Sequence, residues 1–137
     1  MATTAPPRHI LAINDDRDIL RIYTELLTDE GYLVSVDVMP ATDLADVHAV
    51  NPDLIVLDLV VGQQDRGTAF LALLRSHPAF RTLPVIVCSA DARRLAELDE
   101  QLRAWDCAVV PKPFDIDVFV AAVRVGLAKG TTAPVAA

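Results

Sequence analysis

Asp58 is the only charged residue in the apolar stretch Leu54–Val61, which is rich in Ile, Leu and Val. A short stretch of this kind predicts a parallel strand that is buried on both faces. A carboxylate buried in mid-strand without a partner is energetically costly, so we expect the strand to end at Asp58. Taken alone, a solvated turn aspartate is the better interpretation of such a residue. Three other polar segments change that weighting.

Each of these segments also follows a short apolar stretch. They are Asn14-Asp15-Asp16, Ser89 and Lys112. Carboxylates combined with backbone carbonyls make a hard-oxygen site of the kind that suits Mg²⁺, which takes one or two carboxylates together with water and phosphate oxygens. No nucleotide-binding glycine loop follows the first apolar stretch, so the common dinucleotide and P-loop sites are disfavoured.

Five predicted strands position these groups, and they alternate with helical patterns of apolar residues three and four apart. The strands are expected at 9–13, 32–38, 54–58, 83–88 and 108–110. The helices are expected before Gly31, over Pro40 to Val50, from Thr68 through Arg75, up to about Ala104, and after the cap at Asp115.

This alternation predicts an α/β fold with a doubly wound, five-stranded parallel sheet and five helices. In the flavodoxin-like strand order 2-1-3-4-5, the first and third strands flank the topological switch point, and Asp15 then lies beside Asp58. The carboxyl ends of parallel strands share one edge of the sheet. All four polar segments are therefore expected at that edge.

Composition limits the classes of protein that fit. The 137 residues suit one domain over 9–129, with a disordered lead-in at 1–8 and a frayed tail at 130–137. A hydrophobic content of 53% excludes a disordered chain, and no apolar stretch approaches the length of a membrane span. We expect a cytoplasmic protein without membrane contact. The net charge of −7 argues against nucleic-acid binding through a basic face.

The polar segments, in their order and strand contexts, resemble those of a response-regulator receiver domain from His9 to Leu127. The matching motifs are the Asn14-Asp15 pair, Leu57-Asp58-Leu59, Cys88-Ser89-Ala90 and Lys112-Pro113-Phe114. The resemblance implies that Asp58 accepts a phosphoryl group in a two-component phosphorelay, through covalent catalysis by a carboxylate. It also implies that Lys112 pairs with Asp58 and then with the phosphoryl group.

The same resemblance implies a Mg²⁺ cofactor held by Asp15, Asp58 and the main-chain carbonyl of Val60, with Asn14 orienting a metal-bound water. Ser89 is implied to move toward the phosphoryl group and so shift the loop that follows. From spacing alone, a turn hydroxyl or helix cap is an equally good interpretation of Ser89. Using Asp15 and Asp16 as the acidic pair is a possible register, although the strand pattern favours Asn14 and Asp15.

Four departures from the family pattern stand out. Asn14 replaces a carboxylate, and Gly62 stands where the loop after Asp58 usually has proline. Val109 replaces the usual switch aromatic, and Trp105-Asp106 replaces a Gly-Ala pair. Because Val109 and Trp105-Asp106 stand at these positions, we expect the output to use a route other than the usual coupling from Ser89 to an aromatic residue.

The leading hypothesis is a single-domain receiver that signals by protein contact and catalyses only its own phosphorylation and dephosphorylation. Its expected partners are a sensor histidine kinase or phosphotransfer protein and an unknown output protein, with a homodimer possible and no direct nucleic-acid contact. Because the chain ends soon after the last helix, we expect no DNA-binding domain.

Two alternatives come from other classes of protein. One is a phosphorylation-independent pseudo-receiver that acts as an interaction module. The other is a small Mg²⁺-dependent phosphohydrolase, which is disfavoured because Val60 stands where a second aspartate would serve as general acid.

Overall fold

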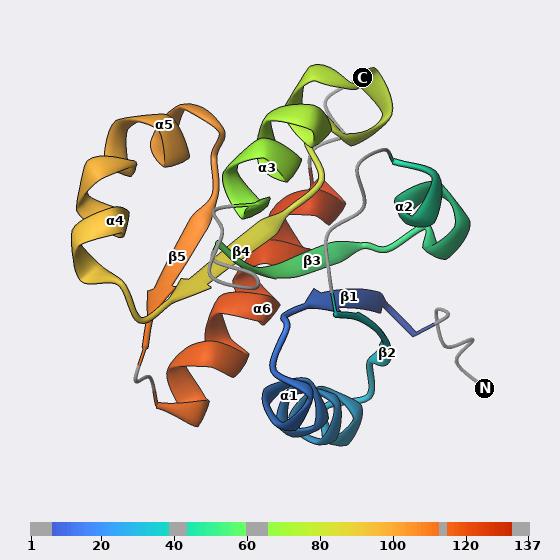
Figure 1. Cartoon of the computed structure of the whole chain (residues 1–137). Helices are drawn as coiled ribbons and strands as arrows, with labels where there is room; N and C mark the ends of the chain where they lie inside the picture. Colours follow the sequence, from blue (N-terminus) through green and yellow to red (C-terminus); the bar gives the residue numbers. More distant parts are fainter. Residues whose placement is uncertain (1–6, 39–43, 60–65, 113–114, 133–137) are drawn as a thin grey trace.

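The computed structural model describes residues 7–38, 44–59, 66–112 and 115–132. They form a five-stranded sheet in the order β2-β1-β3-β4-β5, in which every neighbouring pair is parallel (Figure 1). The predicted doubly wound α/β sheet of flavodoxin-like order 2-1-3-4-5 is therefore confirmed.

The three central strands are almost entirely buried, as expected for parallel strands covered on both faces. The edge strands β2 and β5 are more exposed. The strands are β1 (His9–Ile13), β2 (Leu33–Asp37), β3 (Leu54–Asp58), β4 (Val85–Ser89) and β5 (Ala108–Pro111).

The helices of the described residues lie between the strands and after β5. They are α1 (Arg17–Asp29), α2 (Ala45–Val50), α3 (Arg66–Ser76), the 3₁₀ helix η1 (Pro78–Phe80), α4 (Ala92–Glu97), α5 (Asp99–Ala104) and α6 (Ile116–Thr132). The single helix expected up to about Ala104 is interrupted at Leu98, so that five expected helices become six. Burial changes at the same point: α4 has no buried residue, whereas Leu102 of α5 is buried.

Other differences concern element ends, and most strand and helix bounds shift by one or two residues. Residues 40–43 of the helix expected over Pro40 to Val50 lie outside the described residues, and α2 begins at Ala45. The last helix continues to Thr132, beyond the expected domain end at 129.

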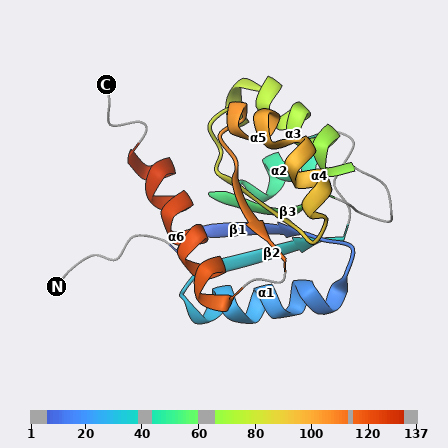
Figure 2. The ribbon, with the colours of Figure 1, turned by 90° about the vertical axis from the view of Figure 1, so that its left-hand side faces the viewer.

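The sheet separates two apolar layers. Buried residues of α1 and α6 pack on one face, and those of α2, α3, η1 and α5 pack on the other (Figure 2). On the first face the rings of Tyr23 and Phe119 stack with centroids 4.8 Å apart, which joins α1 to α6. None of the helices in the described part of the chain combines the length and apolar character needed to cross a bilayer.

Candidate functional site

The polar residues singled out from the sequence meet at the carboxyl edge of the sheet. Asp58 and Ser89 are the last residues of β3 and β4, and Asn14 and Lys112 directly follow β1 and β5. Because β1, β3, β4 and β5 are adjacent and in register, their ends place these four residues side by side. This is the edge at which open α/β sheets bind ligands.

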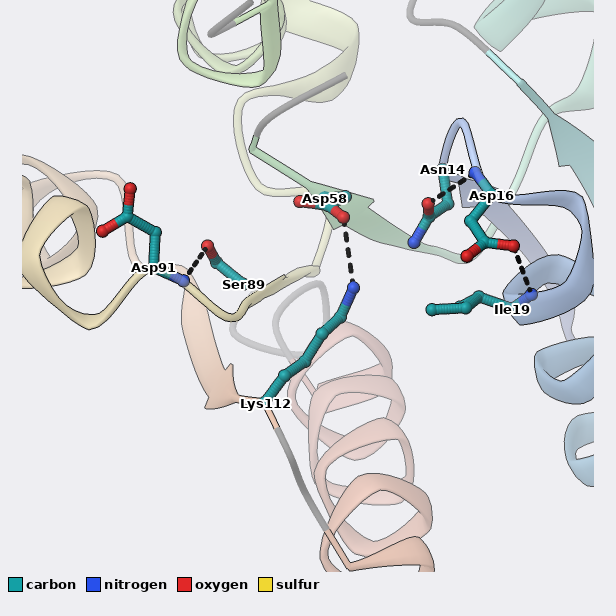
Figure 3. Close-up of polar contacts among 7 residues, drawn as sticks. All are labelled: Asn14, Asp16, Ile19, Asp58, Ser89, Asp91 and Lys112. Atoms are coloured by element: carbon teal, nitrogen blue, oxygen red, sulfur yellow. Dashed lines mark hydrogen bonds and ion pairs between the residues drawn. The ribbon is translucent and has the colours of Figure 1, made fainter. Parts of the chain in front are cut away.

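A buried ion pair stands at the centre of this edge. The Nζ of Lys112 lies 3.1 Å from Oδ2 of Asp58, and the two side chains are only 16% and 14% exposed (Figure 3). Both charges have lost most of their hydration, so each one needs the other as its counter-charge. The remaining exposure leaves the Asp58 carboxylate accessible to a ligand.

Asn14 and its two acidic neighbours have different environments. Asn14 is 2% exposed, its Oδ1 accepts a hydrogen bond from the Asp16 backbone N–H at 2.9 Å, and its amide nitrogen points toward the Asp58–Lys112 pair (Figure 3). The Asp16 carboxylate caps α1 by accepting from the backbone N–H groups of Asp18 and Ile19. Asp15 is exposed. Because Asp16 is used as a helix cap, the register that pairs Asn14 with Asp15 is favoured.

Ser89 is buried and held in place by its surroundings. Its Oγ accepts a hydrogen bond from the Asp91 backbone N–H at 3.1 Å, and its carbonyl oxygen accepts from the Lys112 backbone N–H at 2.8 Å. The Asp91 carboxylate in turn caps α4 by accepting from the Arg94 backbone N–H. Ser89 therefore connects the ends of β4 and β5 to the beginning of α4. The hydrogen bond from the Asp91 N–H fits the turn hydroxyl that spacing alone left open for Ser89.

Gly67 brings the start of α3 against the backbone of the acidic strand. Its N–H donates to the carbonyl oxygen of Leu59 at 2.9 Å. A Cβ at this position would lie 2.6 Å from the Leu59 Cα and 2.9 Å from the Asp58 carbonyl oxygen. Only glycine permits this approach, so Gly67 positions the backbone at Asp58. Gly67 directly precedes the helix predicted from Thr68, whereas α3 begins at Arg66, so the sequence did not indicate that this glycine lies inside a helix.

A buried thiol and a buried phenol lie next to the site, and both have raised pKa values. Burial raises the pKa of the Cys88 thiol to about 12 and also raises the pKa of the Tyr23 hydroxyl. Cys88 lies opposite Asp58 in the β3–β4 ladder, and the Lys112 charge partly opposes the increase in its pKa. Both groups remain protonated at neutral pH, so the lysine and the carboxylates carry the charge of the site. Cys88 and Cys107 are both free thiols.

Besides Asn14, two more departures from the family pattern can be located. Val109 is 40% exposed on the edge strand β5, and Asp106 follows α5 with a positive φ of 54°. Val60, whose carbonyl was implied as a metal ligand, and Gly62 lie outside the described residues. Within the described part of the chain, no group of three His, Cys, Asp or Glu side chains forms a metal site.

Comparisons with known proteins agree with this geometry. Residues 10–124 match the family model of the response regulator receiver domain. The chain is 32% identical over 127 residues to the regulatory protein VirG of Agrobacterium tumefaciens. The aligned residues make up 89% of this chain and 44% of VirG. It is 30% identical over 132 residues to the transcriptional regulatory protein PdtaR of Mycobacterium tuberculosis, with 93% of this chain and 60% of PdtaR covered. The chain thus spans less than two thirds of these relatives.

Solved structures match over nearly their whole length. A sensor protein from Polaromonas sp. JS666 superimposes with a TM-score of 0.78 at 26% identity, covering 91% of this chain and 99% of that one. A CheY-like response regulator receiver domain protein from Methanospirillum hungatei superimposes with a TM-score of 0.79. At 20% identity, covering 92% of this chain and 98% of that one, it supports the fold alone.

Proposed function

Because the chain belongs to the response regulator receiver domain family of two-component signalling, we propose that Asp58 accepts a phosphoryl group from a phosphohistidine or small phosphodonor. The buried Asp58–Lys112 pair at the carboxyl edge of the sheet carries this proposal. A carboxylate oxygen of Asp58 forms a bond to phosphorus while the bond from phosphorus to the donor breaks. With a phosphohistidine donor, the imidazole leaves with the electron pair.

The neighbouring residues have complementary roles in the proposal. Lys112 neutralises Asp58 before transfer and stays within reach of the phosphoryl oxygens afterwards, as a positive point charge. Ser89 exchanges its hydrogen bond from the Asp91 N–H for one to a phosphoryl oxygen. That exchange would release the start of α4, because the Asp91 carboxylate caps this helix.

The donor set also fits Mg²⁺, which receiver domains typically bind. Asp15 and Asp58 supply two carboxylates from neighbouring strand ends, and Mg²⁺ uses one or two carboxylates together with water. The Val60 carbonyl completes the proposed ligands, with Asn14 orienting a water. When bound, the ion would neutralise charge on the transferring phosphoryl oxygens.

Receiver domains of response regulators interact with histidine kinases or phosphotransfer proteins. In the proposal such a protein supplies the phosphoryl group, and the output passes to another protein by contact. Receiver domains are in general signalling modules rather than enzymes. The only reactions proposed for this chain are accepting the phosphoryl group and losing it to water.

Intact-mass spectrometry after incubation with acetyl phosphate and Mg²⁺ tests the proposal. We expect one phosphoryl adduct on the native chain and none on Asp58→Asn. Asp37→Asn is a matched control, because Asp37 also ends a strand, at the same edge of the sheet. An adduct on Asp58→Asn, or an adduct lost equally in the control, would contradict the assignment of Asp58.

A pseudo-receiver is the second candidate, and Asn14 is the observation that favours it. This buried amide stands where a carboxylate would strengthen the metal site. If the folded native chain forms no adduct while a known receiver does under the same conditions, the pseudo-receiver is preferred. Its partner would then bind the native chain and Asp58→Asn equally well.

A further inference from the structure

A large apolar groove lies far from the proposed phosphorylation site. Its volume is about 960 Å³, and α3, β4 and α6 contribute to its walls, together with the loop between η1 and β4 and the segment between α5 and β5. The strand residues that line it, Val85, Ile86 and Ala108, belong to the amino ends of β4 and β5. The groove is therefore at the opposite edge of the sheet from Asp58.

One wall is a side of α6 whose valines are exposed among the described residues. Phe119, Val123 and Leu127 pack into the core, whereas Val118 and Val125 are 54% and 59% exposed and line the groove. An amphipathic surface helix normally exposes polar residues away from its buried side. Here α6 is apolar on both sides, and Figure 2 shows its second half diverging from the strands.

The charged residues at the groove are mainly basic. Arg75, Arg81 and Lys129 line it, whereas Asp106 is its single acidic residue, in a chain of net charge −7. Arg75 donates to the carbonyl oxygens of Trp105 and Phe80, and Lys129 lies 3.4 Å from Asp106. Among the residues that the structure describes, no carboxylate forms an ion pair with Arg75 or Arg81. The groove thus combines an apolar lining with an excess of positive charge.

We propose that this groove binds an amphiphilic carboxylate of the fatty-acid class, with the alkyl chain along the exposed valines of α6 and the carboxylate at the basic residues. The volume is at the upper end of the range of small-ligand sites, about 300–1,000 Å³. A second copy of the chain is the competing occupant, and sedimentation distinguishes it from the ligand.

The only tryptophan of the chain makes the proposal directly testable. Trp105 lines the groove and is half-buried, so its fluorescence reports whether the groove is occupied. We expect a saturable fluorescence change with dodecanoate below its micelle concentration. Across octanoate, decanoate and dodecanoate, affinity should rise about three- to fourfold for each methylene buried. Dodecanol, which lacks the charge, should bind at least tenfold more weakly than dodecanoate.

Matched pairs of variants locate the site. Val125→Glu and Arg81→Glu should each weaken dodecanoate binding at least tenfold. Ile22→Glu and Arg93→Glu should leave it unchanged, because both residues are exposed on helices outside the groove. Circular dichroism of each variant verifies folding.

Three results would overturn the proposal. The first is the absence of saturable binding, and the second is binding that Val125→Glu and Arg81→Glu leave unchanged. The third is ligand-free dimerisation in sedimentation experiments that Val125→Glu abolishes, which would identify a second copy as the occupant. None of these measurements depends on phosphorylation of Asp58.

Discussion

Lys112 and Asp58 form an ion pair in which each partner is largely buried. We expect Lys112→Ala to lower the free energy of unfolding by about 3 kcal/mol, because it leaves a buried carboxylate without its counter-charge. Urea unfolding measures this loss.

A double-mutant cycle with Asp58→Asn separates the ion pair from packing. The double variant should lose less free energy of unfolding than the two single variants lose together, and the difference should be about 1–3 kcal/mol. Additive losses would mean that the Lys112 stem, rather than its charge, stabilises the fold.

Asn14 lies in the same site and is uncharged, whereas the family pattern has a carboxylate at this position. We expect Asn14→Asp to raise Mg²⁺ affinity about tenfold, because an added carboxylate strengthens a hard-oxygen site. Without Mg²⁺ the variant should be about 1–3 kcal/mol less stable, since position 14 is 2% exposed and the added charge is poorly solvated. Thermal unfolding with and without saturating Mg²⁺ measures both effects.

Asn51→Asp is the control for this substitution, because Asn51 is exposed at the end of α2. It should show neither effect. Equal Mg²⁺ dependence of the two variants would argue that the ion does not bind beside Asn14.

Sequence reasoning at this scale located Asn14, Asp58, Ser89 and Lys112 at one edge, because each follows a short apolar strand of a parallel sheet. The hydrogen bond from the Asp91 N–H to Ser89 matches the turn-hydroxyl interpretation, which spacing alone left equal to the switch role. Residue type could not choose between the two roles, because a serine hydroxyl can accept from a local backbone N–H or donate to a ligand.

Gly67 and Gly126 show how the elements approach one another. We expect Gly67→Ala to destabilise the chain by about 2 kcal/mol or more, because its Cβ would meet the backbone of Leu59 at 2.6 Å. Gly126→Ala should cost less, since its Cβ would approach the Cδ1 end of the Leu54 side chain at 2.8 Å rather than backbone, and alanine favours the helix. Chemical denaturation of the two variants compares them directly, and equal losses would argue against the close approach of α3 to β3.

The end of α5 is constrained by Asp106. Its φ of 54° is unfavourable for branched side chains, while glycine accepts it freely. We expect Asp106→Val to destabilise the chain by about 1–2 kcal/mol and Asp106→Gly to change stability by less than about 0.5 kcal/mol. Thermal melts followed by Trp105 fluorescence measure both, and a tolerated valine would contradict the left-handed conformation.

The predicted elements differ in accuracy for a physical reason. The strands at 9–13 and 54–58 match the structure to the residue, because their sequences change abruptly from polar to apolar where burial begins. The break at Leu98 was missed, because α4 and α5 are largely solvated and a narrow apolar stripe does not reveal a change of direction.

Across the whole molecule, the buried thiol and phenol predict how stability depends on pH. The folded chain keeps the Cys88 proton up to about pH 12, whereas an ordinary thiol loses it near pH 9.0. This contribution is fully present below pH 9.0 and is lost as the pH rises toward 12; the raised pKa of Tyr23 acts in the same direction.

We therefore expect stability to fall with rising pH above 9.0, and to fall less steeply in Cys88→Ala and in Tyr23→Phe. Denaturant unfolding across this pH range measures the slope. Val56→Ala is the control, because it shortens a buried side chain without removing a titratable group. An unchanged slope in both test variants would contradict the assigned burial.

The four residues at the carboxyl edge all come from strand ends or the positions just after them, and none from the outer surface of a helix. Substitutions on the exposed helical surfaces can therefore change which molecules the chain recognises while its central chemistry stays the same. Such a separation lets a duplicated gene acquire a new partner in small steps, without first losing its reactive aspartate.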